Sequence, residues 1–515
     1  MPIESDNVLH SKGGRLRSNA QFPTGQTSSA PTSSSDDVIR ILTQAVTAGP
    51  KNGLVVHFHG GLVDYHDGIG IAKELAPYYS AAGSYPLFFV WEAGLFEALR
   101  NNKAQLLQDP AFREFVKKVS EWVLRKIGTG ATLKGTGTPA DINFETLRQD
   151  FDRYFDDVTD HSTPPTERLD VDPATANSAK KSAELDEHGL AEDIYLHAID
   201  DDPAFVDAFE RLAAQATLAK GREKAGAALD STLMDADAQA ELLGTNDPTT
   251  TKKGVISVAA AAVYVAKIVI KVLTRYQRNT DHGMYCTVVE EVLRKAYMDL
   301  AGAAIWRQMK LDTQDSFGQD PECCGSTVVN ALKGLDGKLS KITLVGHSTG
   351  AIYICSFLDA AAVADVTTPI DVVFLAPAVS HRRFAAALAS HRTLIRRFRM
   401  FGMLDELECA DKMLPPVYTR SLLYFVSGLL EGDPDASGQW APRVGMPLVG
   451  MRRYLDKFAD DEDVRKVAQF LESAEGLSVW SDVSGTDGLS SSARKHGDFD
   501  NDGATLASLK HFIAT

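Results

Sequence analysis

The run Gly346-His347-Ser348-Thr349-Gly350 constrains the fold of this chain more than any other feature. It follows an apolar run at 342–345 that is typical of a buried strand, and a helical pattern over 349–364 begins within it. Two glycines permit a tight strand-to-helix turn that holds the serine above the edge of a sheet. The N–H groups at the start of that helix would face a negative charge forming beside the serine. The sequence therefore predicts an activated serine.

Apolar runs without polar alternation recur along the chain and are separated by helical patterns. Such strands are typical of a mostly parallel sheet with helices on both faces. Helices are expected at 70–82, 349–364, 384–390, 421–431 and 504–513. Strands are expected at 38–46, 54–58, 86–91, 342–345, 370–375, 397–403 and 477–483.

In this motif and this alternation, the chain resembles the α/β-hydrolase superfamily of serine esterases and lipases. The resemblance implies an α/β-hydrolase fold and a catalytic triad in the chain order serine, acid, histidine. It implies Ser348 as the nucleophile and His496 as the base, because His496 lies between the last expected strand and the last expected helix. The other downstream histidines lie in or beside expected helices: His381, His391 and His511.

The resemblance places the acid of the triad after the strand at 397–403. Asp405 is the first carboxylate beyond that strand, so we expect it to orient His496. Further carboxylates lie within about two turns and stay open as alternatives: Glu406, Glu408 and Asp411.

The resemblance also implies an oxyanion hole built from two backbone N–H groups. One belongs to Thr349, the residue after the nucleophile. The other belongs to the loop His59-Gly60-Gly61-Leu62, where Gly61 is expected to donate and Leu62 remains an alternative. The expected reaction is cleavage of a small carboxylic ester through an acyl-enzyme, without a cofactor or metal. The alternatives are a lipase or phospholipase at a lipid interface, and a binding protein that keeps the fold without catalysis.

Several histidines and carboxylates invite a metal-site interpretation that the sequence does not favour. His57 and His59 match no common metal-ligand spacing and are explained by a strand that ends in the oxyanion loop. The series Asp498-x-Asp500-x-Asp502 starts like a calcium loop, but Leu509 stands at the twelfth position, so these carboxylates are expected to cap the last helix.

Residues 96–339 are expected to form one helical insertion, cap-like or lid-like, in a core domain built from residues 37–95 and 340–515. Helices are expected there at 105–127, 202–220, 257–276 and 287–309. Within the insertion, residues 151–210 contain 17 Asp and Glu against four Lys and Arg, and they are interpreted as a solvated face. His282 is expected to serve a helix cap or turn, although a place above the active site is the alternative.

Composition narrows the classes of partner and compartment. The net charge of −16 argues against nucleic acid as a partner. Lys267 and Lys271 interrupt the most apolar stretch, 255–273, so no transmembrane span is expected, although peripheral contact with lipid is possible. Five cysteines without a C-x-x-C pair, and a start without a signal-like segment, favour a cytoplasmic protein. Residues 1–36 are expected to be a disordered tail. The oligomeric state stays open.

Overall fold

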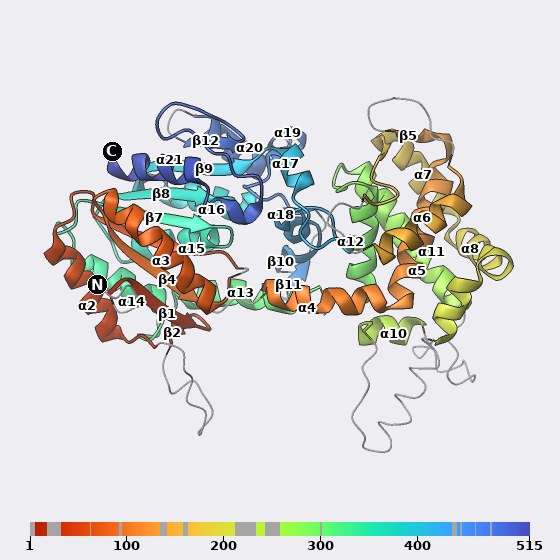
Figure 1. The fold of residues 1–515 in the computed structure, drawn as a ribbon, viewed down its shortest axis with the longest axis horizontal. Coiled ribbons are helices and arrows are strands. Elements are labelled where there is room, and N and C mark those ends of the chain that lie inside the picture. The colour runs from red at the N-terminus through yellow and green to blue at the C-terminus, as the bar shows by residue number, and fades with distance from the viewer. Residues whose placement is uncertain are drawn as a thin grey trace, which may run out of the picture.

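The protein consists of two lobes, an α/β lobe and a helical lobe, joined by several segments (Figure 1). The expected α/β class is confirmed, with a mostly parallel central sheet flanked by helices. The computed structural model describes the whole chain except residues 1–5, 18–31, 62, 92–94, 134–141, 158–162, 212–232, 243–257, 299–300, 435–439, 443–444, 459 and 474–475.

The sheet of the α/β lobe has eight strands in the order β12-β9-β8-β7-β3-β4-β1-β2. All neighbours run parallel except β1 and β2, which are antiparallel. From β3 the chain moves on to β4, whereas from β7 it moves to β8 on the other side, so the order of strands reverses between β3 and β7. Ligands of open α/β sheets bind at the carboxyl ends of strands at such a point. The strands are β1 (Val8–Lys12), β2 (Arg15–Leu16), β3 (Leu54–Phe58), β4 (Tyr85–Trp91), β7 (Ile342–His347), β8 (Ile370–Leu375), β9 (Ile395–Met403) and β12 (Gly476–Ser481).

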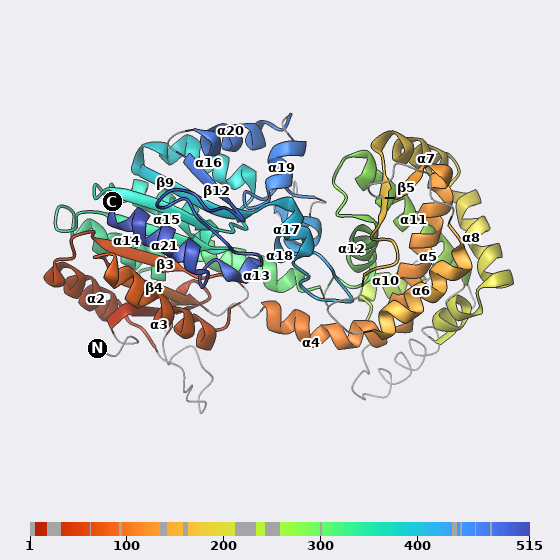
Figure 2. The ribbon, with the colours of Figure 1, turned by 45° about the horizontal axis from the view of Figure 1, so that its top comes forward.

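Helices cover both faces of this sheet, and Figure 2 shows α16 and α20 on one side of it and α3 on the other. Side chains of the central strands are fully buried, which explains their apolar runs. One face is covered by α2 (Ser35–Ala48), α14 (Cys324–Lys333), α15 (Gly350–Val363), α16 (His381–His391) and α20 (Glu462–Glu472), and the other by α3 (Tyr65–Ala81) and α21 (Gly503–Ala514).

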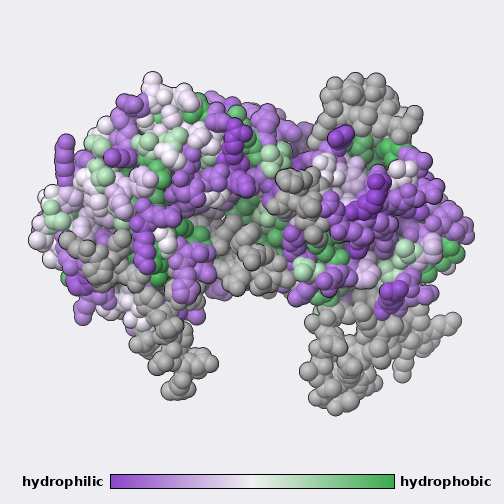
Figure 3. All heavy atoms as spheres, in the orientation of Figure 1, coloured by the Kyte–Doolittle hydropathy of each residue, from purple (hydrophilic) through white to green (hydrophobic). Residues whose placement is uncertain are grey.

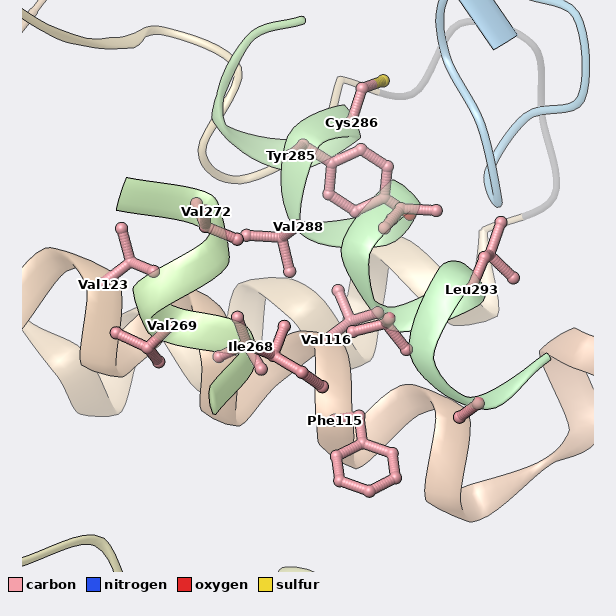
Figure 4. Close-up of a cluster of buried hydrophobic side chains, with 14 of the residues drawn as sticks. Phe115, Val116, Val123, Ile268, Val269, Val272, Tyr285, Cys286, Val288 and Leu293 are labelled. Atoms are coloured by element: carbon pink, nitrogen blue, oxygen red, sulfur yellow. The ribbon is translucent and has the colours of Figure 1, made fainter. Parts of the chain in front are cut away.

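The helical lobe is built around α11 (Val258–Gln277), which packs against α5, α7, α8 and α12. Apolar side chains of α5, α11 and α12 meet in its interior (Figure 4). Hydrophilic residues cover much of the visible face of this lobe (Figure 3). Its other elements are α4 (Leu95–Gln108), α5 (Pro110–Ile127), η2 (Gly128–Gly130), β5 (Ala131–Leu133), α6 (Phe144–Asp156), β6 (Leu169–Val171), α7 (Pro173–Leu185), α8 (Glu187–Asp201), a helix over 203–211, α10 (Ala236–Leu242) and α12 (Met284–Ala296).

The segment after β9 lies between the two lobes. Its apolar side chains, including Tyr418, Phe425 and Tyr454, belong to the same buried cluster as the helical lobe. The lobe is therefore held by residues from the second half of the chain as well as by its own helices. The segment contains α17 (Asp405–Ala410), α18 (Leu422–Phe425), a π-helical turn (Val426–Leu430), β10 (Gly432–Pro434), β11 (Trp440–Pro442) and α19 (Arg452–Lys457).

Two expectations for the N-terminal region are wrong. Part of the expected disordered tail forms β1 and β2 at the edge of the sheet, because Val8 and Leu9 bury their side chains beside β4. The expected strand at 38–46 is helix α2. Its buried residues Val38, Ile41, Leu42 and Ala45 follow helical spacing, and Ser34 and Asp37 form a capping box.

The expected boundaries of the insertion also need correction. The helix expected at 287–309 is two helices, α12 and α13 (Ala303–Asp315). Helix α14 lies in the expected insertion but packs on α2 and α15 of the α/β lobe. The residues 212–220 of the helix expected at 202–220 lie outside the described residues. In the described part of the chain, no helix is both long and apolar enough to cross a membrane.

Candidate active site

Ser348 occupies a strained turn between β7 and α15. Its φ is +53°, a left-handed conformation that costs free energy for a residue with a side chain. Backbone hydrogen bonds hold the turn: the Ser348 N–H donates to the Leu375 carbonyl at 2.9 Å, and the Ala378 N–H donates to the Ser348 carbonyl at 3.0 Å. Leu375 ends β8 and Ala378 follows that strand, so the neighbouring strand holds the serine in this conformation.

The two glycines of the motif allow the close packing that this turn needs. A Cβ at Gly346 would lie 2.6 Å from the carbonyl carbon of Gly350. A Cβ at Gly350 would collide with the backbone of Phe58 in β3. The motif therefore brings α15 against both β7 and β3, at the carboxyl ends of the strands.

Ser348 and His496 are buried without hydrogen bonds from their functional atoms. Ser348 is 2% exposed and His496 is 5% exposed. Neither Oγ of Ser348 nor either ring nitrogen of His496 has a hydrogen-bond partner among the described residues. Buried polar atoms normally have partners, so such a group calls for a functional explanation.

His347 connects the His496 loop to the turn that holds Ser348. Its Nε2 lies 2.9 Å from the backbone carbonyl oxygen of His496, and the two rings stack with centroids 5.3 Å apart. Its Nδ1 lies 3.2 Å from Oδ2 of Asp500. His347 is therefore held between the loop after β12 and the serine that follows it in sequence.

Both partners of His347 favour the protonated ring. The His496 carbonyl only accepts a hydrogen bond, so Nε2 carries a proton, and the Asp500 carboxylate lies within ion-pair distance of Nδ1, where its charge favours the doubly protonated ring. Burial opposes this charge, but Asp500 outweighs it and raises the pKa of His347. Burial, together with the charge on His347, lowers the pKa of His496 to about 3. His496 is thus kept neutral, the form that can accept a proton.

The carboxylates after β9 lie in different surroundings. Oδ1 of Asp405 accepts a hydrogen bond from the Tyr424 hydroxyl at 2.6 Å, and the structure does not bring this carboxylate to the His496 ring. Oδ2 of Asp411 accepts the backbone N–H of His496 at 2.8 Å. Glu408 is fully buried against Ser421, and burial raises its pKa well above the usual range. Glu406 is exposed.

The loop after β3, which contains Gly60 and Gly61, lies against Ser348. A Cβ at Gly60 would lie 3.2 Å from Cβ of Ser348, and one at Gly61 would lie 3.1 Å from Oγ1 of Thr349. A Cβ at Gly61 would also collide with Met309 of α13, so α13 covers this loop. Within the described residues, the N–H groups of Gly61 and Thr349 have no acceptor. Leu62 lies outside the described residues.

The side chains of His57 and His59 hold the end of β3 and the start of the glycine loop in place. Nδ1 of His57 lies 2.9 Å from the Tyr79 hydroxyl. Nδ1 of His59 lies 2.8 Å from the Gly60 carbonyl, and the Trp91 N–H donates to its Nε2 at 3.1 Å. Burial lowers the pKa of His57 to about 3 and that of His59 to about 4, so both rings are neutral. No group of three or more metal-ligating side chains is found in the described part of the chain.

The other candidate residues from the sequence are His282, Asp500 and Asp502, and each has partners in the structure. His282 is buried where the helical lobe meets the segment after β9: its Nδ1 lies 2.8 Å from Glu290 and its Nε2 lies 3.3 Å from the Tyr454 hydroxyl. Asp502 caps α21, as expected for the acidic series. Asp500 does not cap the helix but faces His347, and this role was missed because nothing in its spacing links it to residue 347.

Comparisons with protein-family models, with curated proteins and with solved structures found no match for this chain.

Proposed function

We propose that this protein is a serine hydrolase that cleaves carboxylic esters, with Ser348 as its nucleophile and His496 as its general base. The single observation that carries the proposal is the left-handed turn at Ser348, whose buried hydroxyl is unpartnered within the described residues, as are the ring nitrogens of His496 in the neighbouring loop. Backbone strain and unsatisfied polar groups each cost stability, and they persist where function requires them.

The chemistry follows from these positions. His496, neutral because of its burial, takes the proton of Ser348 as the serine oxygen attacks the ester carbonyl. The N–H groups of Gly61 and Thr349 donate to the oxyanion, and each such donor contributes about 3 kcal/mol to lowering the barrier. The alcohol leaves with the proton from His496. Water then attacks the acyl-enzyme by the same route and releases the acid.

For the acid that orients His496, Asp411 has the stronger geometric support. It already accepts a hydrogen bond from the backbone of His496, whereas Asp405 is bound to Tyr424. A rotation of the His496 side chain is needed before its Nδ1 can donate to a carboxylate, because both ring nitrogens are unpartnered among the described residues. Asp405, the residue expected from the sequence, remains the rival.

Substrate must also reach a serine that is only 2% exposed. Met309 of α13 lies against the Gly61 loop, so displacement of this flexible side chain is one route to the oxyanion hole. The helical insertion thus contacts the site through α13, which packs against α15 of the α/β lobe.

A fluorophosphonate probe tests the proposal, because it reacts with activated serines. We expect one probe per chain on the wild type and none on Ser348→Ala. The matched control is Ser120→Ala: Ser120 is fully buried in α5 and its hydroxyl also lacks a partner in the described part of the chain, but it lies in the helical lobe. Labelling that survives in Ser348→Ala, or a wild type that is never labelled, would refute the proposal.

A further inference from the structure

A cavity lies close to the candidate active site, between α13, α15 and α16. It has a volume of about 430 Å³, within the usual range of small-molecule pockets. Its walls carry four cationic side chains and one carboxylate: Arg307, Lys310, Arg382, Arg383 and Glu431.

The charge of this cavity contrasts with the rest of the chain, whose net charge is −16. Lys310 is paired with Glu431, and Arg383 with Asp359. Arg307 is exposed on α13 and has no ion-pair partner among the described residues. The charge of Arg307 is therefore not balanced by an ion pair among the described residues, and a concave surface with an unbalanced positive charge concentrates anions.

The floor of the cavity is close in the fold to the nucleophile. Ile352 lies one helical turn after Ser348 on α15 and is 7% exposed. Val379 follows Ala378, whose N–H donates to the Ser348 carbonyl. Helix α13 lines the cavity with Arg307 and Lys310, and its Met309 reaches the oxyanion loop. An anion bound here would contact the same helix that covers Gly61.

We propose that this cavity binds a carboxylate or phosphate group carried by a small molecule. A guanidinium group binds two oxygens of a carboxylate or a phosphate at once, and Arg307 of α13 and Arg382 of α16 both line the cavity. The anion is either the acid end of the ester substrate, in which case this inference rests on the proposed function, or a separate molecule.

Binding is tested by calorimetry with inorganic phosphate and with succinate at constant ionic strength. We expect saturable binding of at least one anion, weakened about tenfold or more by Arg307→Gln combined with Arg382→Gln. Arg465→Gln is the matched control, because Arg465 is an exposed arginine on α20 outside the cavity. No saturable binding of either anion, or equal binding by the double variant, would overturn the proposal.

The source of the anion is separated by two esters of similar length, p-nitrophenyl butyrate and p-nitrophenyl hemisuccinate. If the substrate carries the anion, the double variant lowers the ratio of kcat/KM for hemisuccinate to that for butyrate by about tenfold. If the anion is a separate molecule, the ratio stays constant and phosphate changes the rate on butyrate. A protein that binds anions but hydrolyses neither ester would refute the proposed function and leave the anion site standing.

Discussion

Two buried histidines, one in each lobe region, differ in how much of their hydrogen-bonding capacity is used. His282 and His496 are both nearly inaccessible, and burial lowers the pKa of both, to about 4 and about 3. Both ring nitrogens of His282 have partners, Glu290 and Tyr454. Both ring nitrogens of His496 lack partners in the described part of the chain. Burial alone therefore does not identify a candidate base, whereas an unused hydrogen-bonding capacity beside a strained serine does.

The largest expected effect is the contrast between replacing these two residues. We expect His496→Ala to lower kcat/KM for an activated ester by about 10⁴ to 10⁶-fold, because the variant lacks the proposed general base. Its free energy of unfolding should fall less than that of His282→Ala, since the ring has no hydrogen bonds to lose among the described residues and loses only its packing against His347. His282→Ala should do the reverse and cost about 2–4 kcal/mol of stability, because it removes one hydrogen-bond partner each from Glu290 and Tyr454 and leaves a buried cavity.

Urea unfolding and steady-state kinetics on the same preparations measure this contrast. If His282→Ala abolished turnover without loss of stability, the distinction between the two histidines would collapse. If His496→Ala were fully active, the base would have to be sought elsewhere.

The next effect separates the two candidate acids after β9. We expect Asp411→Asn to lower kcat by about 10⁴-fold, as loss of a triad carboxylate does, because His496 would lose its orienting partner. Asp405→Asn should have a much smaller effect on kcat, since its carboxylate accepts a hydrogen bond from the Tyr424 hydroxyl. Arg453 donates both to that hydroxyl and to the backbone carbonyl of Asp281 in the helical lobe, so this network is structural. The opposite ranking in steady-state kinetics would restore Asp405 as the acid.

The core strands and the serine turn could be predicted from the sequence because their signals are local. A buried parallel strand is a continuous apolar run, and the strand expected at 370–375 is the same as β8. Helix α2 was mistaken for a strand because its apolar residues are dense, although the spacing of Val38, Ile41, Leu42 and Ala45 is helical. Strand β1 was missed because a five-residue edge strand hardly changes the composition of a polar segment.

The residues that contact the His496 loop could not be predicted, because these contacts depend on how loops far apart in the sequence come together. Asp411 and His496 are 85 positions apart, and His347 and the His496 carbonyl are 149 positions apart. The carboxylates Asp405 and Asp411 are separated by one short helix, so spacing along the chain could not decide which of them faces His496.

The smallest expected effect concerns Asp500, which faces His347 and favours a positive charge on that ring beside His496. Asp500 is the only carboxylate among the described residues that faces the His347 ring. The rings of His57, His59 and His496 also lie near His347, but burial lowers their pKa values and keeps them neutral. Asp500→Asn removes the charge of the carboxylate. We expect a loss of about 1–3 kcal/mol of stability near pH 6, because the charged ring of His347 would stay buried without its ion-pair partner.

The pH dependence of this loss is what distinguishes an ion pair from packing. Because the pKa of His347 is raised on folding, its contribution is complete below the pKa of about 6.5 of an unfolded histidine and is lost as pH rises through the folded value. The pKa of Asp500 is lowered despite its burial, mainly by His347, so its contribution is lost as pH falls below about 4. The difference in unfolding free energy between wild type and Asp500→Asn should therefore be largest between about pH 4 and 6.5 and shrink on either side. A difference that stays constant from pH 4 to pH 9 in urea titrations would show that Asp500 acts by packing alone, and the neutral state of His496 would then rest on burial without help from a charged neighbour.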